Sequence, residues 1–223
     1  AESPAQFGFL YTGSDDGYIH RSENGGGSWD RISDDLPQDL WVSRVIASEH
    51  QKERVYVTLN GYRNDDFAAY VYVSEDRGIS WKSINRNLPN SPVNVIREDP
   101  NNDQILYLGN DQGVYVSFDQ GQNWQPFNKG LTTAAVHDLV VQSEANHLLV
   151  GTHGRSIYKA DLAPFQKLNN AFLKQELALL DPEKVKHSKR WGSSYSSWRK
   201  VFEPETTFTA FAKTSGAYEM QIK

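Results

Sequence analysis

An eight-residue box occurs three times in this chain and constrains its fold more than any other feature. Each copy reads S-x-[D/N]-x-G-x-[S/N]-W, as in SENGGGSW, SEDRGISW and SFDQGQNW. The copies lie roughly 45 residues apart, a period typical of architectures built from one repeated supersecondary unit. The residues that define the box are Ser22, Asn24, Gly26 and Trp29; Ser74, Asp76, Gly78 and Trp81; and Ser117, Asp119, Gly121 and Trp124. We therefore expect one small structural unit to recur along the chain.

The residues between the boxes predict four short strands in each repeat. In the second repeat these strands are Val42–Ala47, Arg54–Leu59, Ala69–Ser74 and Trp81–Ile84. Alternation in VYVTL, from Val55 to Leu59, favours a strand with two packed faces over a helix. Short connections rich in Gly, Asn, Asp and Pro suit hairpins. The pattern predicts an all-β fold, a β-propeller of four-stranded antiparallel blades.

Counting the repeats predicts an incomplete propeller over residues 1–168. The first repeat begins with its second strand, at Phe9–Thr12, and the last repeat, LLVGTHGRSIYKAD from Leu148 to Asp161, has lost the box. This gives about three and a half blades, whereas propellers usually need 4–8 blades to close. We expect the remainder of the propeller or a second chain to complete the ring.

The C-terminal part of the chain has a different pattern. Ala163–Phe172 predicts a short helix, with Phe165, Leu168 and Phe172 on one side. Residues 169–200 predict a basic linker with a short helix or strand, and its run KVKHSKR, at 184–190, is either a solvated segment or a docking segment for an acidic face. Residues 201–223 alternate like two strands about a turn at 214–216 and predict a β-hairpin that begins a β-sandwich-like segment.

The chemistry of the box favours a structural role over an active site. The short Asn or Asp side chain can accept hydrogen bonds from backbone N–H groups of its own turn. The glycine supplies a backbone conformation that a Cβ would penalise. The tryptophan can bury a large apolar area, and we expect it to pack into the seam between sheets.

Composition and motifs exclude several classes of function. The chain has a net charge of −5 and its main body is acidic, which argues against a nucleic-acid partner. No run approaches the ~18 apolar residues of a membrane span. There is no cysteine, and the six histidines form no zinc motif. We expect no cofactor and no metal.

The boxes and the last repeat resemble the Asp-box, or bacterial neuraminidase repeat, propellers. This group includes sialidases, xyloglucan-cleaving endoglucanases, sortilin-type receptor propellers and exported bacterial BNR-repeat proteins. The segment VHDLVVQSEANHLLVGTHGRSIYKAD is similar to the last blade of that bacterial set, and the resemblance covers about Phe9–Leu168. It implies a bacterial protein with an extracytoplasmic location, which is secreted, periplasmic or on the cell surface. It also implies a box that lies away from the ligand face.

In the families that the chain resembles, ligands bind near the propeller axis, on loops that include those between the second and third strands. The insertion at Asn60–Ala69 lengthens one of these loops beyond the repeat norm, which makes it the strongest functional candidate. Several of the loop aspartates are also good turn formers. The candidate ligand-binding residues on these loops are Asp15, Asp16, Tyr62, Arg63, Asp65, Asp66, Asp111, His153 and Arg155.

Two functions remain open at this point. The first is an exported propeller module that binds a protein or glycan and is non-catalytic as an isolated chain. The alternative is part of a glycoside hydrolase, sialidase-like or xyloglucanase-like, whose paired carboxylates are completed by blades outside this chain. Asp65 and Asp66 are adjacent in sequence and do not form an obvious pair across a groove, so the sequence identifies no catalytic residue.

Overall fold

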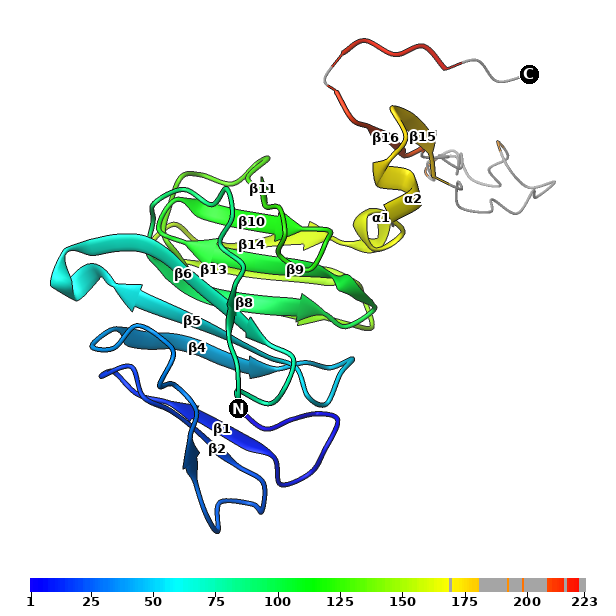
Figure 1. Ribbon diagram of the computed structural model, residues 1–223. Coiled ribbons are helices and arrows are strands. Elements are labelled where there is room, and N and C mark those ends of the chain that lie inside the picture. The colour runs from blue at the N-terminus through cyan, green and yellow to red at the C-terminus, as the bar shows by residue number, and fades with distance from the viewer. Residues whose placement is uncertain (169, 181–191, 193–197, 199–207, 215, 221–223) are drawn as a thin grey trace. The chain divides into compact units, whose positions relative to one another are not determined.

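The structure is a computed structural model that describes residues 1–168, 170–180, 192, 198, 208–214 and 216–220 (Figure 1). The chain divides into two compact units, Ala1–Gln166 and Lys167–Lys223. The predicted basic run at 184–190 lies outside the described residues, as does the first part of the predicted sandwich segment, at 201–207. The predicted boundaries of the linker stay a prediction.

The first unit consists of antiparallel sheets that follow one another along the chain. The two middle sheets have four strands each and the outer two have three, which confirms the expected architecture of antiparallel blades. We call these sheets the first to fourth blades. The first contains β1 (Leu10–Gly13), β2 (Ile19–Ser22) and β3 (Asp30–Arg31); the second β4 (Trp41–Ala47), β5 (Val55–Gly61), β6 (Asp66–Ser74) and β7 (Lys82–Ser83); the third β8 (Val93–Asp99), β9 (Asn102–Asn110), β10 (Gly113–Ser117) and β11 (Gln125–Pro126); and the fourth β12 (Val136–Gln142), β13 (His147–Thr152) and β14 (Ile157–Asp161).

Apolar side chains fill the seams between successive blades. Val55, Val57 and Leu59 pack against the first blade, whereas Tyr56 packs against the third, so the alternation along β5 places its two faces in two different seams. A third cluster, which contains Tyr107 and Leu148, joins the third and fourth blades. Figure 1 shows the sheets as successive layers. Burial on both faces explains why the middle strands are so rich in apolar residues.

The first blade differs from the prediction at its inner edge. We expected its first strand to be missing, but Ala1–Ser3 lie along β1 at the place of that strand. Glu2 forms an isolated antiparallel bridge with Leu10, and the N-terminal ammonium of Ala1 donates to the carbonyl of Tyr11 at 2.6 Å. These bonds satisfy backbone groups on an edge that would otherwise be unpaired.

Each box forms the same hydrogen-bonded hairpin between the third and fourth strands. In the second blade Ser74 Oγ accepts from the backbone N–H of Gly78 at 2.7 Å, and Asp76 Oδ1 accepts from the N–H of Ser80 at 2.8 Å. The first and third boxes repeat both bonds with distances of 2.8–2.9 Å. Gly26, Gly78 and Gly121 have φ angles of +95°, +90° and +83°, a region that a Cβ would penalise. The box is therefore a structural turn.

The tryptophans of the boxes confirm the predicted packing in two cases out of three. Trp124 is 2% exposed. Trp81 is half-buried in the seam between the first and second blades, which we call the first seam; the second and third seams follow in chain order. Trp29 is 41% exposed, so its expected seam position is wrong for the described residues. The physical reason is that Trp81 and Trp124 each pack on the preceding blade, and no blade precedes the first one within the described part of the chain.

The predicted single helix at Ala163–Phe172 is divided into two short helices, α1 (Ala163–Gln166) in the first unit and α2 (Asn170–Leu173) in the second. Lys167 and Leu168 follow α1 and are not helical. Phe165 of α1 packs edge-on against Phe127 of the third blade, with ring centroids 5.0 Å apart.

The second unit contains a two-stranded sheet with a pairing that differs from the prediction. β15 (Leu177–Leu179) pairs antiparallel with β16 (Ala210–Ala212), whereas we expected residues 208–212 to pair with 218–222. Residues 216–220 form no strand. The alternating pattern of β16 predicts a strand but not its partner, because any strand of suitable register can supply the ladder.

Candidate functional site

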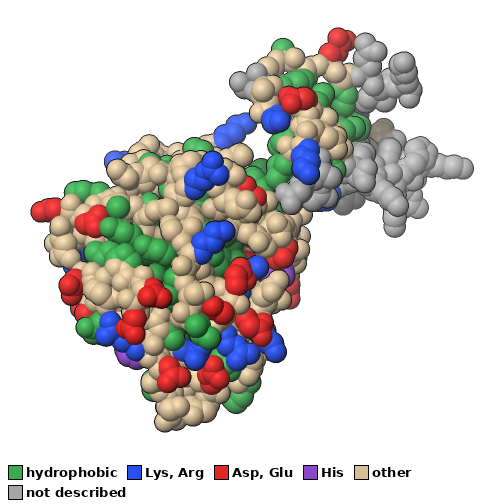
Figure 2. Space-filling view, in the orientation of Figure 1, with side chains coloured by type: hydrophobic (Ala, Val, Ile, Leu, Met, Phe, Trp, Pro, Cys, Tyr) green, Lys and Arg blue, Asp and Glu red, His purple; other side chains and the backbone are tan. Residues whose placement is uncertain are grey.

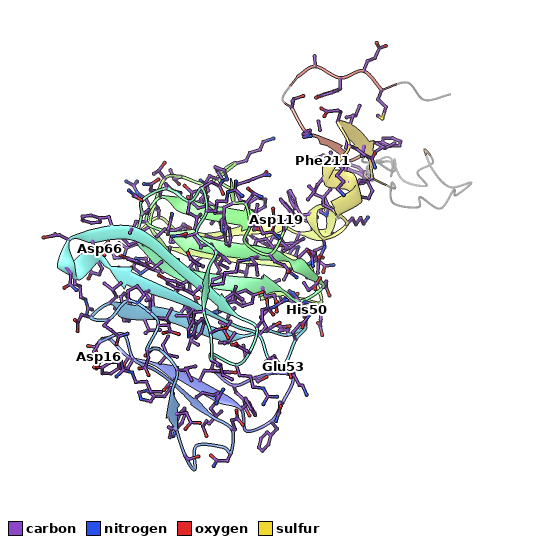
Figure 3. All side chains as sticks on the ribbon, in the orientation of Figure 1. Asp16, His50, Glu53, Asp66, Asp119 and Phe211 are labelled. Atoms are coloured by element: carbon purple, nitrogen blue, oxygen red, sulfur yellow. The ribbon has the colours of Figure 1, made fainter. Side chains whose placement is uncertain are left out.

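The loops between the second and third strands of the four blades form what we call the loop face, at residues 14–18, 62–65, 111–112 and 153–156. Antiparallel pairing places these loops at one end of the blades and the box hairpins at the other. In Figure 3, Asp16 and Asp66 lie at one end of the strands, while His50 and Glu53 lie at the opposite end. The predicted ligand-binding residues therefore share one face, away from the boxes.

Hydrogen bonds join the loop face from one blade to the next. The N–H of Asp39, which precedes the second blade, donates to the carbonyl of Asp16 at 3.2 Å. Asn64 Nδ2 in turn donates to the carbonyl of Asp39 at 2.8 Å. The loops of the first two blades are thus linked through the backbone of Asp39, and the side chain of Asp15 makes no hydrogen bond with the described residues.

A chain of amide hydrogen bonds crosses the second and third blades beneath the loops. Asn60 Nδ2 donates to Asn94 Oδ1 at 2.9 Å, and Asn94 Nδ2 donates to Asp111 Oδ1 at 2.9 Å. Asn94 also donates to the carbonyl of Val136 in the fourth blade at 3.2 Å. Asn60 is 3% exposed and Asn94 is 8% exposed, so the chain is buried. The N–H of Tyr62 donates to Asn60 Oδ1 at 3.0 Å. The chain of hydrogen bonds therefore connects the exposed Asp111 to the loop that begins at Tyr62.

The inserted loop of the second blade presents an aromatic and cationic surface. The guanidinium of Arg63 lies 5.4 Å from the ring centroid of Trp41 and 6.0 Å from that of Tyr62. Tyr62 is 48% exposed and Phe67 is 52% exposed. Part of the insertion is the 3₁₀ turn η1 (Tyr62–Asn64), which ends at Asp65 with φ = +57°. Tyr62 and Arg63 of this turn are exposed.

The fourth blade contributes a pair of histidines. The rings of His137 and His153 lie 5.1 Å apart with an interplanar angle of 35°, and both side chains are exposed. The N–H of His153 donates to the carbonyl of Ala135 at 2.8 Å, which fixes the loop against the start of β12. Arg155, in the same loop, makes no hydrogen bond or ion pair with the described residues.

Asp16 and Asp66, at the first two loops, have lowered pKa values. The Ser14 hydroxyl, and then the N–H of Tyr18, stabilise the carboxylate of Asp16 and lower its pKa. The N–H of Ala68 and the Tyr70 hydroxyl, at 3.0 and 2.7 Å, lower the pKa of Asp66. The same hydrogen bond raises the pKa of Tyr70 to about 12. Both carboxylates are therefore ionised at neutral pH and occupied by intrachain donors.

Metal coordination has no support in the described part of the chain. No group of three His, Cys, Asp or Glu side chains lies close enough to hold an ion there. Within the same residues, no hydrogen bond or ion pair joins two of the predicted carboxylates. The loop face thus offers hydrogen bonding, aromatic contact and a cation.

Sequence reasoning missed four residues of this face, which are Trp41, Asn60, Asn94 and His137. Asn60 and Asn94 lie in or beside buried strands, where an amide must find a partner, and this is the signal that could have found them. Trp41 lies in no motif, whereas His137 belongs to the VHDL strand through which the chain resembles the last blade of bacterial propellers, although it was not chosen as a site residue. Figure 2 shows acidic and basic side chains interspersed over the visible face of the first unit, without a large basic patch.

Two kinds of comparison agree with this architecture. The family model described as "Sortilin, neurotensin receptor 3" matches residues 69–167. No curated protein sequence matches the chain. Among solved structures, the GH74 xyloglucanase from Xanthomonas campestris is 17% identical with a TM-score of 0.57, covering 72% of this chain and 28% of the xyloglucanase.

Two further solved structures give the same result. A GH74 enzyme from Niastella koreensis is 17% identical with a TM-score of 0.56, covering 71% of this chain and 27% of that enzyme. An ancestral GH74 enzyme is 18% identical with a TM-score of 0.55, covering 72% and 23%. The chain thus spans about a quarter of the length of these enzymes, and at this identity the similarity concerns the fold.

These findings define the class of the protein. The chain is a partial β-propeller with blades of the Asp-box type. Its matched region, residues 69–167, is similar to sortilin-type propellers, and its fold is similar to that of GH74 propellers. No helix among the described residues is long and apolar enough to cross a bilayer.

Proposed function

We propose that this chain is part of an exported propeller module that binds a protein or glycan on its loop face and does not itself catalyse a reaction. The observation that carries the proposal is that two loop carboxylates, those of Asp16 and Asp66, are held by hydrogen bonds from their own loops. A glycoside hydrolase needs one carboxyl with a raised pKa as general acid. Asp16 and Asp66 instead have lowered pKa values and accept intrachain hydrogen bonds.

The side chains around these carboxylates suit recognition. Tyr62 and Phe67 expose about half of their surfaces, and Arg63 lies over Trp41. Aromatic residues and arginine are enriched in the central parts of binding interfaces, where they supply large rigid contacts. The buried amide chain from Asn60 to Asp111 pre-organises the face, which lowers the ordering cost of binding.

An extracytoplasmic location is part of the proposal. It is supported by the similarity of residues 69–167 to sortilin-type propellers. The remainder of the propeller, or a second chain, would complete the ring around the loop face.

The second candidate function is part of a glycoside hydrolase. The similarity of the fold to GH74 enzymes favours it, because this chain corresponds to only about a quarter of those enzymes. In that case Asp65 or Asp111, which are exposed on the loop face, would act together with a carboxylate from blades outside the chain.

One experiment separates the two functions. The chain within its complete propeller would be offered xyloglucan oligosaccharides and a displayed peptide library, with binding and release of reducing ends both measured. The binding module predicts retention that is lost in a Tyr62→Ala, Arg63→Ala variant, without turnover. Turnover that disappears in Asp65→Asn or Asp111→Asn would establish the hydrolase and contradict our proposal.

A further inference from the structure

The third seam, between the third and fourth blades, contains a pocket of about 600 Å³. We call it the third-seam pocket. Its apolar lining includes Val114, Phe127, Leu131, Val150, Tyr158 and Phe165. The fourth blade, which forms one side of this seam, has three strands and no box. The pocket can therefore be compared with the two seams in which the following blade does carry a box.

In the second seam the box tryptophan Trp124 is part of the packing. Its side chain is 2% exposed and belongs to a core cluster with residues of both blades. Within that cluster Tyr115 pairs with Leu108 across the ladder, and the N–H of Ile84 donates to the carbonyl of Val71 at 2.9 Å. These four residues define the surroundings of a box tryptophan in a closed seam.

The third-seam pocket is lined by the equivalents of those residues one blade further on. Tyr158 pairs with Val150 in the same way, and the N–H of Phe127 donates to the carbonyl of Val114 at 2.8 Å. All four line the pocket, but the fourth blade supplies no residue in the place of Trp124. The third-seam pocket is therefore a tryptophan site without its tryptophan.

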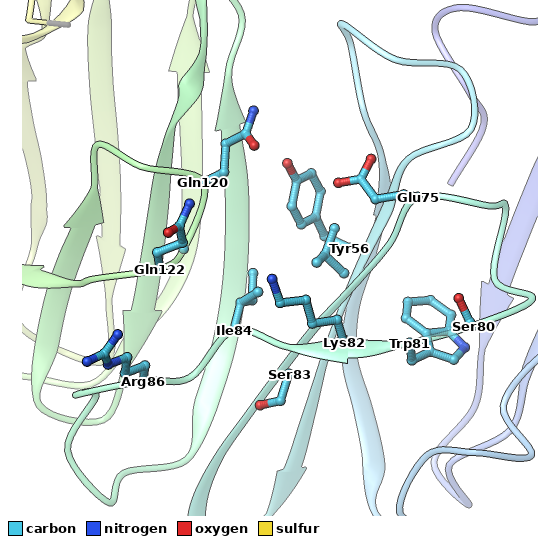
Figure 4. Close-up of a pocket in the computed structure, with 12 residues that line it drawn as sticks. Tyr56, Glu75, Ser80, Trp81, Lys82, Ser83, Ile84, Arg86, Gln120 and Gln122 are labelled. Carbon is cyan, nitrogen blue, oxygen red and sulfur yellow. The ribbon is translucent and has the colours of Figure 1, made fainter. Parts of the chain in front are cut away.

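The box also covers the second seam from outside. Figure 4 shows Gln120 and Gln122 of the third box on one side of that seam and Trp81 of the second blade on the other. The groove that remains there holds about 420 Å³, and the buried Trp124 does not line it. The third seam lacks this cover and has the larger pocket, so its interior is accessible.

The carbonyl of Phe127 gives the pocket an unused acceptor. In the first two seams the carbonyl three residues past a box tryptophan, that of Ile32 or Ile84, accepts the indole N–H of the next box at 2.7 Å. Phe127 lies three residues past Trp124, and its carbonyl accepts no hydrogen bond from the described residues. Phe165 packs edge-on against Phe127, but its ring has no N–H to donate.

The outer edge of β14 is also unoccupied in the described part of the chain. In the second and third blades the fourth strand, β7 or β11, pairs with the third strand over two residues. β14 is the last strand of its sheet, so its outward backbone groups have no ladder partner among the described residues. The segments that begin with the box tryptophan and run through the fourth strand read WDRI, WKSI and WQPF. A segment of the pattern W-x-x-[I/F] therefore matches both the pocket and the edge.

The fourth blade packs without such a segment. Leu139 and Leu148 are fully buried and Val150 is 4% exposed, while Phe165 adds to the same cluster from α1. A strand that is not needed to bury the core can come and go. This favours a separate chain as the occupant over a permanent part of the blade.

From these features we propose that the third-seam pocket binds an extended segment of a partner protein with the sequence pattern W-x-x-[I/F]. The indole would enter the pocket and donate its N–H to the carbonyl of Phe127, and the residues after it would add to the outer edge of β14. In this mode the main chain supplies affinity and the pocket supplies specificity. None of the lining residues belongs to the loop face, so the site is additional to the proposed function.

The probe is the peptide GISWKSI, capped at both ends, which copies Gly78–Ile84 of this chain. Titration calorimetry measures its affinity for the 223-residue chain and for the chain within its complete propeller. The comparison ligands are the same peptide with alanine in place of tryptophan, the same peptide with 2-naphthylalanine there, and free indole. Naphthylalanine keeps a two-ring side chain but has no N–H. Amide hydrogen exchange along β14 reports whether the peptide adds to its edge.

The matched variants are Ala160→Leu and Ala160→Ser. Ala160 lines the pocket and occupies the place that Ser117 has in the third blade. Leucine at this position would fill part of the pocket, whereas serine is the residue that the boxed blades have there. Ala160→Leu should weaken binding of GISWKSI about tenfold or more, and Ala160→Ser should change it less than about twofold.

We expect GISWKSI to bind both forms of the protein and to slow exchange of β14 amides. The alanine peptide should bind at least about tenfold more weakly, and the naphthylalanine peptide about fivefold more weakly, the value of one hydrogen bond. The proposal is overturned if GISWKSI does not bind, if the alanine peptide or free indole binds as tightly, or if Ala160→Leu has no effect. It is also overturned if β14 exchange is unchanged, or if the complete propeller excludes the peptide, since its own chain would then fill the pocket.

Discussion

The indole N–H of Trp124 donates a hydrogen bond of 2.7 Å to the backbone carbonyl of Ile84, three residues past the preceding box tryptophan. Trp81 repeats the relationship with Ile32 at the same distance. A buried indole that satisfies its polar atom on the neighbouring blade links the two sheets in one fixed offset. The repeated box is therefore an inter-blade joint, which explains why the same box residues recur in successive repeats.

The joint predicts unequal costs for removing the tryptophans. Trp124→Ala should lower the free energy of unfolding by ~3–5 kcal/mol, because it opens a cavity and leaves the Ile84 carbonyl without its donor. Trp29→Ala should cost less than about 1.5 kcal/mol, since Trp29 is 41% exposed. Urea unfolding of both variants measures the difference, and equal costs would show that the seam contact contributes nothing.

The box glycines predict a separable steric effect. Gly121 has φ = +83°, and a Cβ there would lie 2.8 Å from Cδ1 of Ile84. Gly130 has nearly the same angle, +81°, with nothing within 4 Å of the added atom. Gly121→Ala should therefore destabilise the protein by at least about 1 kcal/mol more than Gly130→Ala. Thermal melting compares them; matching midpoints would mean that the blades are not in contact at this point.

Tyr56 and Tyr11 lie at equivalent positions of their blades, and we expect removal of the hydroxyl to change the free energy of unfolding differently at each. The Tyr56 hydroxyl donates to Glu98 Oε1 at 3.0 Å inside the second seam, so Tyr56→Phe should cost ~1–3 kcal/mol. The buried Tyr11 hydroxyl has no partner among the described residues, so Tyr11→Phe should be neutral or stabilising. Denaturant titration checks both, and a larger cost for Tyr11→Phe would contradict the assigned packing.

Acid should weaken the second box through Asp76. Burial raises its pKa, but hydrogen bonds from Ser80, Ser74 and backbone N–H groups outweigh burial and leave the pKa below the usual value of 3.8. A carboxyl whose pKa is lower in the folded state stabilises the protein above about pH 4 and loses this contribution as the pH falls further.

The matched variant is Asp76→Asn, because Asn24 already fills this place in the first box and accepts from the N–H of Ser28 at 2.9 Å. The difference in unfolding free energy between the natural chain and Asp76→Asn should shrink as the pH is lowered from 6 to about 3. A constant difference across that range would show that the carboxylate charge does not contribute.

Much of the fold was predictable because the box and the alternation of β5 are local signals. A strand with Val55, Val57 and Leu59 on one face and Tyr56 on the other already implies two packed surfaces. The pairing of β15 with β16 was not predictable, since the period of two is the same for every candidate partner.

The loop face was predictable only in part. Turn-forming loops after the second strands indicated Asp16, Asp66 and Asp111, because propeller topology gathers those loops at one end. The amide chain through Asn60 and Asn94 depends on the offset between two blades, which no single strand encodes. The contact between the rings of His137 and His153 depends in the same way on the packing of β12 against a loop.

Hydrogen exchange of the indole N–H groups tests the role of the boxes most directly. If the boxes join neighbouring blades, the indole protons of Trp81 and Trp124 exchange slowly because they are bonded to Ile32 and Ile84, while that of Trp29, which has no such bond among the described residues, exchanges rapidly. Rapid exchange at all three tryptophans under native conditions would contradict the account.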